Sequence, residues 1–222
     1  MAARKRSAPS PKTRPQSREK LTPRGGRKKA AVRKAPKHAL PHIASELVDG
    51  FSYVRKLIRE LPNFPQPGVL FKDITPLLAN PKAFHIVLDA IAERFMGEHI
   101  DAVVGIESRG FIFGGALAAR LNASFVPVRK PGKLPYRTDK VSYSLEYGES
   151  ELEMHRDSLS EGSRVLVVDD LLATGGTAAA AGELVHRQGA YVAAYAFVVE
   201  LLSLDGRDRL MPTPVISFLQ YD

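Results

Sequence analysis

The sequence has no cysteine among its 222 residues, so disulfides, thiolate metal sites and a cysteine nucleophile are excluded. The lack of cysteine also fits the cytoplasm, which is the location we expect. No run of about eighteen apolar residues occurs, and we therefore expect no membrane span. Neither G-x-x-x-x-G-K-[ST] nor H-E-x-x-H is present, so the chemistry has to come from other patterns.

Charge is distributed unevenly along the chain. The formal net charge is +8, yet residues 1–45 hold fourteen Lys or Arg against one acid, Glu19, for a net of +13. This leaves 18 of the 32 basic and 23 of the 24 acidic side chains to the other residues, for a net of −5. We therefore expect a mildly acidic domain, long enough to bury a core, behind a strongly basic segment.

The basic segment, residues 1–44, lacks apolar periodicity and carries six prolines. Such a composition buries too little apolar surface to offset the entropy of ordering, so we expect a disordered extension. Three interpretations stay open: an organelle transit peptide, a polybasic arm that contacts nucleic acid or acidic surfaces, and an upstream extension without a role. In each case the folded domain is residues 45–222.

A strand, two acids and a glycine turn follow one another in the second half of the chain. Residues 165–168 are a continuous apolar run, which is typical of a strand buried on both faces of a parallel sheet. Asp169 and Asp170 come next, and A-T-G-G-T then opens an alanine-rich helix. The turn consists of Ala173, Thr174, Gly175, Gly176 and Thr177.

This turn has the chemistry of a phosphate site. Paired glycines bring backbone N–H groups together, threonine hydroxyls add donors, and the helix N-terminus adds partial positive charge. Carboxylates beside a phosphate need other partners. We interpret Asp169 and Asp170 as acceptors for ribose hydroxyls, with Mg²⁺ able to lie between the acids and the phosphates. The pattern therefore indicates a site for a ribose 5-phosphate.

Two earlier strands also end in cationic turns. The strand Ala102–Ile106 leads into E-S-R-G, where Arg109 offers a fixed fork suited to diphosphate. The strand Ser124–Val128 leads into R-K-P-G-K, which begins with Arg129 and ends with Lys133. Because the carboxyl ends of parallel strands meet at one edge of a sheet, we expect these three cations to surround a diphosphate.

The remaining segments complete an α/β pattern. Apolar spacing predicts helices over Ser45–Leu61, ended by Pro62, and over Pro81–Met96, with a rigid irregular loop after the first. Two more strands are expected, at Tyr191–Val199 and at the edge, Val215–Leu219. Between residues 138 and 155 the alternation breaks into a hairpin, whose closure over a substrate would exclude water.

These segments resemble the type I phosphoribosyltransferases. V-L-V-V-D-D-L-L-A-T-G-G-T, at 165–177, is similar to the motif that binds phosphoribosyl diphosphate, and E-S-R-G-F-I-F-G, at 107–114, is similar to the diphosphate loop. F-P-Q-P-G-V-L-F-K-D-I, at 64–74, resembles the amino-terminal segment of the adenine-specific members. L-E-Y-G, at 145–148, and the ending F-L-Q-Y-D are also similar, so the resemblance covers residues 45–222.

The resemblance implies a fold and a reaction. The fold would be α/β: a central, mostly parallel sheet flanked by helices, with an amino-terminal hood over the purine and an antiparallel flap hairpin. The reaction would be purine salvage, in which adenine and 5-phospho-α-D-ribose 1-diphosphate (PRPP) give AMP and diphosphate. Mg²⁺ would be the cofactor, held mainly by substrate oxygens near Asp169 and Asp170, and the enzyme would be a homodimer.

The resemblance also assigns roles to single residues. Leu70 and Phe71 would help to wall the base, and Lys72 would lie near the site. Arg109 would act on the diphosphate, next to a non-proline cis peptide bond between residues 107 and 108. Glu146, in the flap, is the candidate for proton transfer at the purine nitrogens, with a solvated loop glutamate as the alternative.

Two other functions stay open. An enzyme for xanthine or another purine would need the same turns and cations. A regulator on the same fold could sense a nucleotide and use the basic segment on RNA or DNA.

Overall fold

The computed structural model describes residues 50–145 and 148–222. Two features named above, the basic segment and the flap residues Glu146 and Tyr147, lie outside the described residues. The boundary between residues 44 and 45 stays a prediction.

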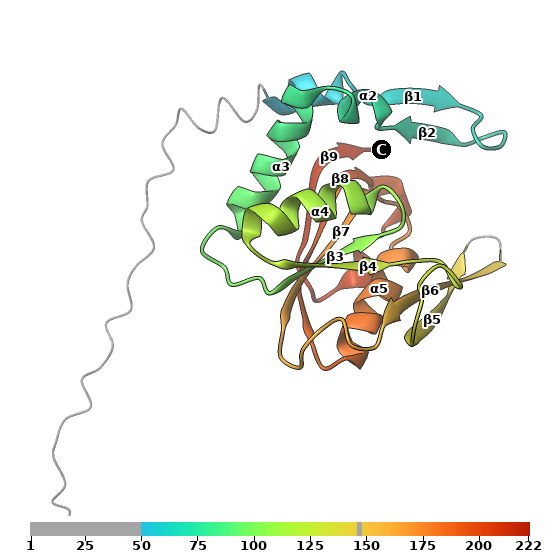
Figure 1. The fold of residues 1–222 in the computed structure, drawn as a ribbon. Coiled ribbons are helices and arrows are strands. Elements are labelled where there is room, and N and C mark those ends of the chain that lie inside the picture. Colours follow the sequence, from blue (N-terminus) through green and yellow to red (C-terminus); the bar gives the residue numbers. More distant parts are fainter. Residues whose placement is uncertain (1–49, 146–147) are drawn as a thin grey trace, which may run out of the picture. The chain divides into compact units, whose positions relative to one another are not determined.

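A five-stranded parallel sheet forms the centre of the fold (Figure 1). Its order is β4-β3-β7-β8-β9, and each neighbouring pair is parallel. The strands are β3 (Ala102–Ile106), β4 (Ser124–Val128), β7 (Arg164–Leu172), β8 (Tyr191–Leu201) and β9 (Val215–Tyr221). The predicted parallel sheet and its β9 edge are confirmed.

Strand β7 is longer than predicted. Asp169 and Asp170 lie within it, because the β7–β8 ladder continues to the pair Leu172 and Glu200. The two acids are therefore held by sheet hydrogen bonds and do not lie on a free loop.

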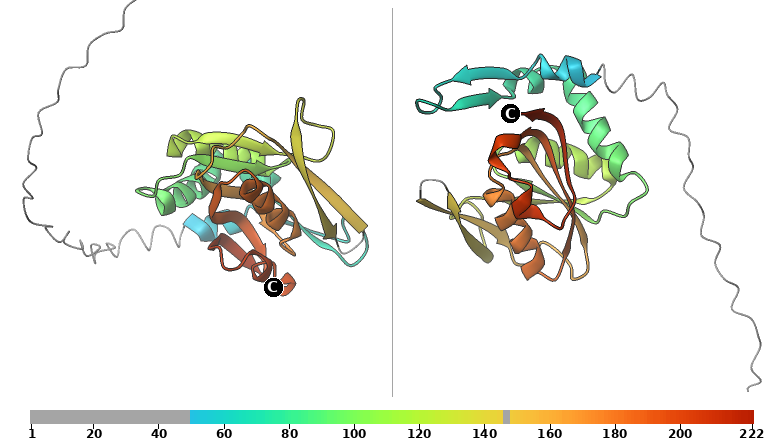
Figure 2. Two further views of the ribbon diagram at one scale, coloured as in Figure 1. Left: turned by 90° about the horizontal axis from the view of Figure 1, so that it is seen from below. Right: turned by 180° about the vertical axis from the view of Figure 1, so that it is seen from behind.

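Helices cover both faces of the sheet, as the continuous apolar run of β7 predicts. Leu166 and Val168 lie in a core with α3 (Pro81–Phe95) and α4 (Gly110–Leu121). Val165 and Val167 lie in a second core with α5 (Gly176–Arg187), on the opposite face (Figures 1 and 2). All four β7 side chains are fully buried, so replacing any of them with a polar residue would disrupt one of the two cores.

The amino-terminal part of the described chain differs from its prediction. Residues 50–55 are helical, but the chain then turns and forms β1 (Arg59–Pro62). This strand pairs antiparallel with β2 (Leu70–Asp73), and the short helix α2 (Thr75–Leu78) follows. The predicted helix up to Leu61 is wrong at its carboxyl end, because the backbone of β1 bonds to β2 and a Glu60–Lys72 ion pair crosses the ladder. We call the β1–β2 hairpin the hood.

The hairpin predicted between residues 138 and 155 is confirmed. β5 (Thr138–Leu145) pairs antiparallel with β6 (Gly148–His155), and we call this pair the flap. Buried Val141, Leu152 and Met154 attach it to the core around α5. The hood and the flap both project on the side where the sheet strands end (Figures 1 and 2).

The strand order places a crevice between β3 and β7. The chain leaves β3 for β4 on one side, and leaves β7 for β8 and β9 on the other. Ligands of open α/β sheets bind at such a switch point, outside the carboxyl ends of the strands. Two short 3-10 helices, η1 (Leu202–Leu204) and η2 (Asp208–Leu210), lie between β8 and β9.

None of the helices in residues 50–145 and 148–222 has the length and apolar composition that crossing a membrane would take.

Candidate active site

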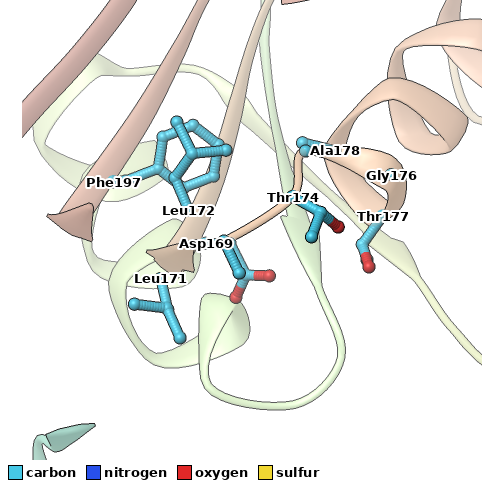
Figure 3. A pocket seen from close by; sticks show the side chains of 10 residues that line it. Asp169, Leu171, Leu172, Thr174, Gly176, Thr177, Ala178 and Phe197 are labelled. Atoms are coloured by element: carbon cyan, nitrogen blue, oxygen red, sulfur yellow. The ribbon is translucent and has the colours of Figure 1, made fainter. Parts of the chain in front are cut away.

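The turn between β7 and α5 lines a small pocket of about 70 Å³. Gly175 adopts a φ of +76°, the left-handed conformation that favours glycine, and α5 begins at Gly176. Figure 3 shows the side chains of Thr174 and Thr177 at this turn, with the carboxylate of Asp169 from the carboxyl-terminal half of β7. Since the first N–H groups of a helix have no partner within it, the turn provides amide and hydroxyl donors around one small space.

The loop after β3 lies against the acids of β7. A Cβ atom on Gly110 would come within 2.7 Å of the Val168 carbonyl oxygen and 2.9 Å of Asp169 Oδ1. Both distances are shorter than van der Waals contact, so the start of α4 approaches β7 this closely only with glycine. This contact brings Arg109 to the two acids. The predicted cis peptide bond between Glu107 and Ser108 is confirmed.

The two acids form a buried pair with unequal partners. Arg109 Nε lies 3.0 Å from Asp170 Oδ2, while Asp169 Oδ1 accepts a hydrogen bond from the Asp170 amide at 2.9 Å. Burial raises the pKa of both carboxyls; the charge of Asp170 raises the pKa of Asp169 further, and Arg109 partly offsets the effect of burial at Asp170. No described group completes a hydrogen bond to Asp170 Oδ2. Asp170 Oδ2 is enclosed against Arg109, so this ion pair fixes Arg109 beside the two acids.

The cationic turn after β4 is organised by Glu107. Its carboxylate binds Arg129 Nε at 3.1 Å and Lys133 Nζ at 2.6 Å, and it accepts the Lys130 amide at 3.1 Å. Burial would raise the pKa of Glu107, but these hydrogen bonds and the Arg129 charge hold it below its usual value. Two cations predicted to bind the diphosphate, Arg129 and Lys133, thus meet at one carboxylate. The sequence shows an acid at position 107, close to Arg109, but it does not show that this acid pairs with the turn after β4.

Glu153 of the flap is a second organising acid, and sequence reasoning missed it. Its side chain is buried, and Oε1 accepts the amides of Lys133 and Leu134, both at 2.9 Å. Its backbone exchanges two hydrogen bonds with Arg129, at 3.0 and 2.7 Å. The flap therefore holds the backbone of the cationic turn in place. A glutamate in an alternating strand has no local pattern that reveals this contact.

A larger pocket of about 370 Å³ joins these parts. Its lining combines the diphosphate-type loop, the β7 acids and the flap: Glu107, Ser108, Arg109, Lys130, Tyr143, Ser150, Leu152, Asp169, Asp170 and Thr177. Asp169 and Thr177 also line the phosphate-type pocket, so the two spaces adjoin. The Thr177 hydroxyl lies 3.3 Å from the Tyr143 hydroxyl, which connects the start of α5 to the flap.

The hood residues lie beside this site in different ways. Leu70 is 47% exposed, and the Phe71 ring lies 5.5 Å from the Arg109 guanidinium carbon, so the hood reaches the diphosphate-type loop. Lys72 is buried; it pairs with Glu60 and lies 4.0 Å over the Tyr221 ring. Its ammonium is therefore occupied by the hood and by the last strand.

Comparison with known proteins agrees with this geometry. A family model described as a phosphoribosyl transferase domain matches residues 73–214. An adenine phosphoribosyltransferase of Sorangium cellulosum (strain So ce56) is 64% identical over 185 residues, which cover 81% of this chain and 92% of that protein. The chain belongs to the adenine phosphoribosyltransferase family. A further family member, from Roseiflexus sp. (strain RS-1), is 57% identical over 165 residues, 74% of this chain and 96% of its own.

Solved structures of adenine phosphoribosyltransferases share the fold. The enzyme of Rhodothermus marinus DSM 4252 superposes with a TM-score of 0.76 at 50% identity, covering 78% of this chain and 99% of that chain. The Saccharomyces cerevisiae enzyme, solved with adenine and an imino-altritol bisphosphate, gives 0.74 at 43% identity, with coverage of 78% and 99%. The family and the fold predicted from the sequence are therefore confirmed.

Proposed function

We propose that this protein transfers the phosphoribosyl group of PRPP to a ring nitrogen of adenine, forming AMP and releasing diphosphate. The observation that carries the proposal is the adjoining pair of pockets, which share Asp169 and Thr177. Along this surface the glycine turn comes first, then two carboxylates, then the cations Arg109 and Lys130. PRPP presents a phosphate, ribose hydroxyls and a diphosphate in the same order. The names of the similar enzymes, and the adenine in one of their structures, support adenine as the base.

The 5-phosphate binds the turn of residues 173–177 in this proposal. The turn amides and the hydroxyls of Thr174 and Thr177 donate to the phosphate, and the N-terminus of α5 favours its charge. The ribose hydroxyls donate to Asp169 and Asp170. Support comes from the position of both acids on the wall of the larger pocket.

Asp169 and Asp170 could also bind Mg²⁺, together with oxygens of the substrate. Carboxylate oxygens are ligands that Mg²⁺ prefers, and Asp169 and Asp170 supply them next to the proposed diphosphate. The described residues contain no group of three or more His, Cys, Asp or Glu that could hold a metal, so substrate oxygens have to complete the coordination. When bound, the metal would help to neutralise charge on the diphosphate.

The diphosphate lies among Arg109, Arg129 and Lys133. As the bond between the anomeric carbon and the diphosphate oxygen breaks, both bonding electrons go to the diphosphate. These fixed cations stabilise the negative charge that develops there. Because Asp170 and Glu107 hold the cations before substrate arrives, little reorganisation is needed.

The base enters between the hood and the flap. Leu70 and Phe71 form apolar walls, and Lys72 supports the hood through Glu60 and Tyr221. A purine ring nitrogen forms the new bond to the anomeric carbon, and Glu146 is the proposed acceptor of the proton that this nitrogen loses. Closure of the flap excludes the water that would otherwise hydrolyse PRPP.

The homodimer, the cytoplasmic location and the role of the basic segment stay predictions.

The test is AMP formation from adenine, PRPP and Mg²⁺, measured beside hypoxanthine, guanine and xanthine. We expect turnover with adenine alone. Asp170→Asn should abolish most of it, while Asp205→Asn, an exposed change outside the pockets, should not. Turnover with another base would refute adenine specificity. Nucleotide binding without turnover on any base would favour the sensor.

A further inference from the structure

The connection between β8 and β9 packs against the back of the phosphate turn. Gly206 is buried, and a Cβ atom there would overlap the Ala173 carbonyl oxygen and come within 3.0 Å of Leu172 Cδ1. In return, a Cβ atom on Gly175 would collide with the Gly206 carbonyl oxygen. Two backbone stretches are therefore in direct contact, with no side chain between them.

The residue after Gly206 is anchored to a buried acid. Arg207 forms a two-point ion pair with Glu200, with Nε–Oε1 at 2.5 Å and Nη2–Oε2 at 2.7 Å. Its Nη1 also donates to the Val215 carbonyl at 2.8 Å, and Ser217 completes the network. Glu200 is 2% exposed and pairs with Leu172 in the β7–β8 ladder. Leu172 is the residue directly before the phosphate turn.

Burial would raise the pKa of Glu200, but Arg207, Ser217 and Gln220 lower it by hydrogen bonding, so the acid stays charged and paired. A planar guanidinium that makes two bonds to a carboxylate holds a defined orientation, which a lysine does not reproduce.

The turn itself has little means of holding its shape. Ala173, Gly175 and Gly176 carry at most a methyl group, and glycine loses more backbone entropy on ordering than any other residue. Order at such a turn has to come from neighbouring structure, and the Gly206 backbone is that neighbour.

We propose that Arg207 is a positioning residue for the phosphate turn. By binding Glu200 and the β9 backbone, it fixes Gly206 against Ala173 and Gly175, so that the turn amides already point at the 5-phosphate site. This inference rests on the proposed function for the identity of the ligand. A preorganised site binds more tightly because less ordering is left to the ligand.

The experiment compares three variants of the full chain. Arg207→Met removes the fork and keeps an unbranched stem, and Arg207→Lys keeps a cation with poorer geometry. The double variant Glu200→Gln with Arg207→Gln leaves no unpaired buried charge, and therefore separates loss of position from an electrostatic penalty. Arg209→Met is the matched control, because Arg209 is exposed in the same connection.

Two measurements distinguish positioning from general damage. Calorimetric binding of ribose 5-phosphate is independent of turnover, and steady-state kinetics give KM for PRPP and for adenine separately. We expect roughly 10- to 100-fold weaker ribose 5-phosphate binding in Arg207→Met and in the double variant, as for other residues that orient a site. KM for PRPP should rise by a similar factor and KM for adenine by less than about twofold, with an intermediate loss in Arg207→Lys.

Equal ribose 5-phosphate affinity in the folded double variant and the wild type would overturn the inference. An equal rise in KM for adenine would also overturn it, because it would show general loosening. If the wild-type chain itself fails to bind ribose 5-phosphate, the phosphate assignment of the proposed function falls, and this inference with it.

Discussion

Replacing Gly110 with alanine tests whether the close approach of α4 to β7 builds the site. The added methyl would lie 2.7 Å from the Val168 carbonyl oxygen, 2.9 Å from Asp169 Oδ1 and 3.2 Å from Asp169 Cα. Two of these three atoms belong to the backbone of a central strand, which cannot move aside as a side chain would. The start of α4 therefore has to move away, and Arg109 moves with it.

The structure sets the size and the sign of this effect. Overpacking of this kind costs about 1–3 kcal/mol of unfolding free energy. Gly115→Ala is the matched control on the same helix, because a Cβ there meets nothing within 4 Å. Alanine is favoured over glycine within a helix by about 0.5–1 kcal/mol, so this control should stabilise the protein. The same substitution, five positions apart, should thus change stability in opposite directions.

Activity should follow the displacement of Arg109. A shift of about 1 Å in a positioning group can cost roughly 100-fold in rate, equivalent to about 2.7 kcal/mol at 1.36 kcal/mol per tenfold. Urea denaturation gives the unfolding free energies, and kcat/KM for PRPP gives the transition-state effect. The reasoning is refuted if Gly110→Ala matches wild type in both measurements, or if Gly115→Ala loses as much.

Three further predictions concern charge and the hood. Asp169→Asn should raise the unfolding free energy at pH 7 while lowering turnover. The folded protein raises the pKa of Asp169, so its ionised form costs stability once the pH exceeds the ordinary pKa of 3.8. Lower stability of the variant at pH 7 in a urea titration would contradict this. Glu107 has a lowered pKa, so its contribution to stability is present above its ordinary value of 4.5 and is lost as pH falls through the folded pKa. Glu107→Gln should therefore flatten the loss of stability below about pH 4.5, and an unchanged acid slope would count against the pairing with Arg129 and Lys133. Tyr221→Leu removes the ring below the Lys72 ammonium. A cation–π contact is worth about 0.5–2 kcal/mol, so KM for adenine should rise by roughly 2- to 30-fold while KM for PRPP stays constant. A rise confined to KM for PRPP would show that the hood has another role.

Errors in the sequence-based prediction share a physical cause. The spacing of Val54 and Ile58 suits a helix, and both side chains are buried, yet the helical residues end at 55. Hydrogen bonds from Arg59–Pro62 to β2, together with the Glu60–Lys72 pair, compete with helix formation and win. Periodicity reports which side chains are buried, but it does not report which backbone groups pair.

The glycine turn between β7 and α5 could be predicted because its residues are contiguous in the chain. An apolar strand, two acids, a glycine pair and a helix start determine their own local geometry, with Gly175 in the left-handed conformation before α5. The choice of partners is different. Arg109 pairs with Asp170, 61 positions away, although Glu107 is two residues from it, and Glu107 takes Arg129 and Lys133 instead.

The sequence by itself determined the residue types of the candidate site and the glycine turn proposed to bind a phosphate, since both depend on local backbone geometry and side-chain chemistry. Only the tertiary structure decided which acid holds which cation, how Glu153 of the flap holds the cationic turn, and how Gly206 backs the phosphate turn. The physical reason is the strand order β4-β3-β7-β8-β9, which makes neighbours of loops distant in the chain. Contacts between such loops are selected by packing and charge in the folded state, and no local pattern encodes them.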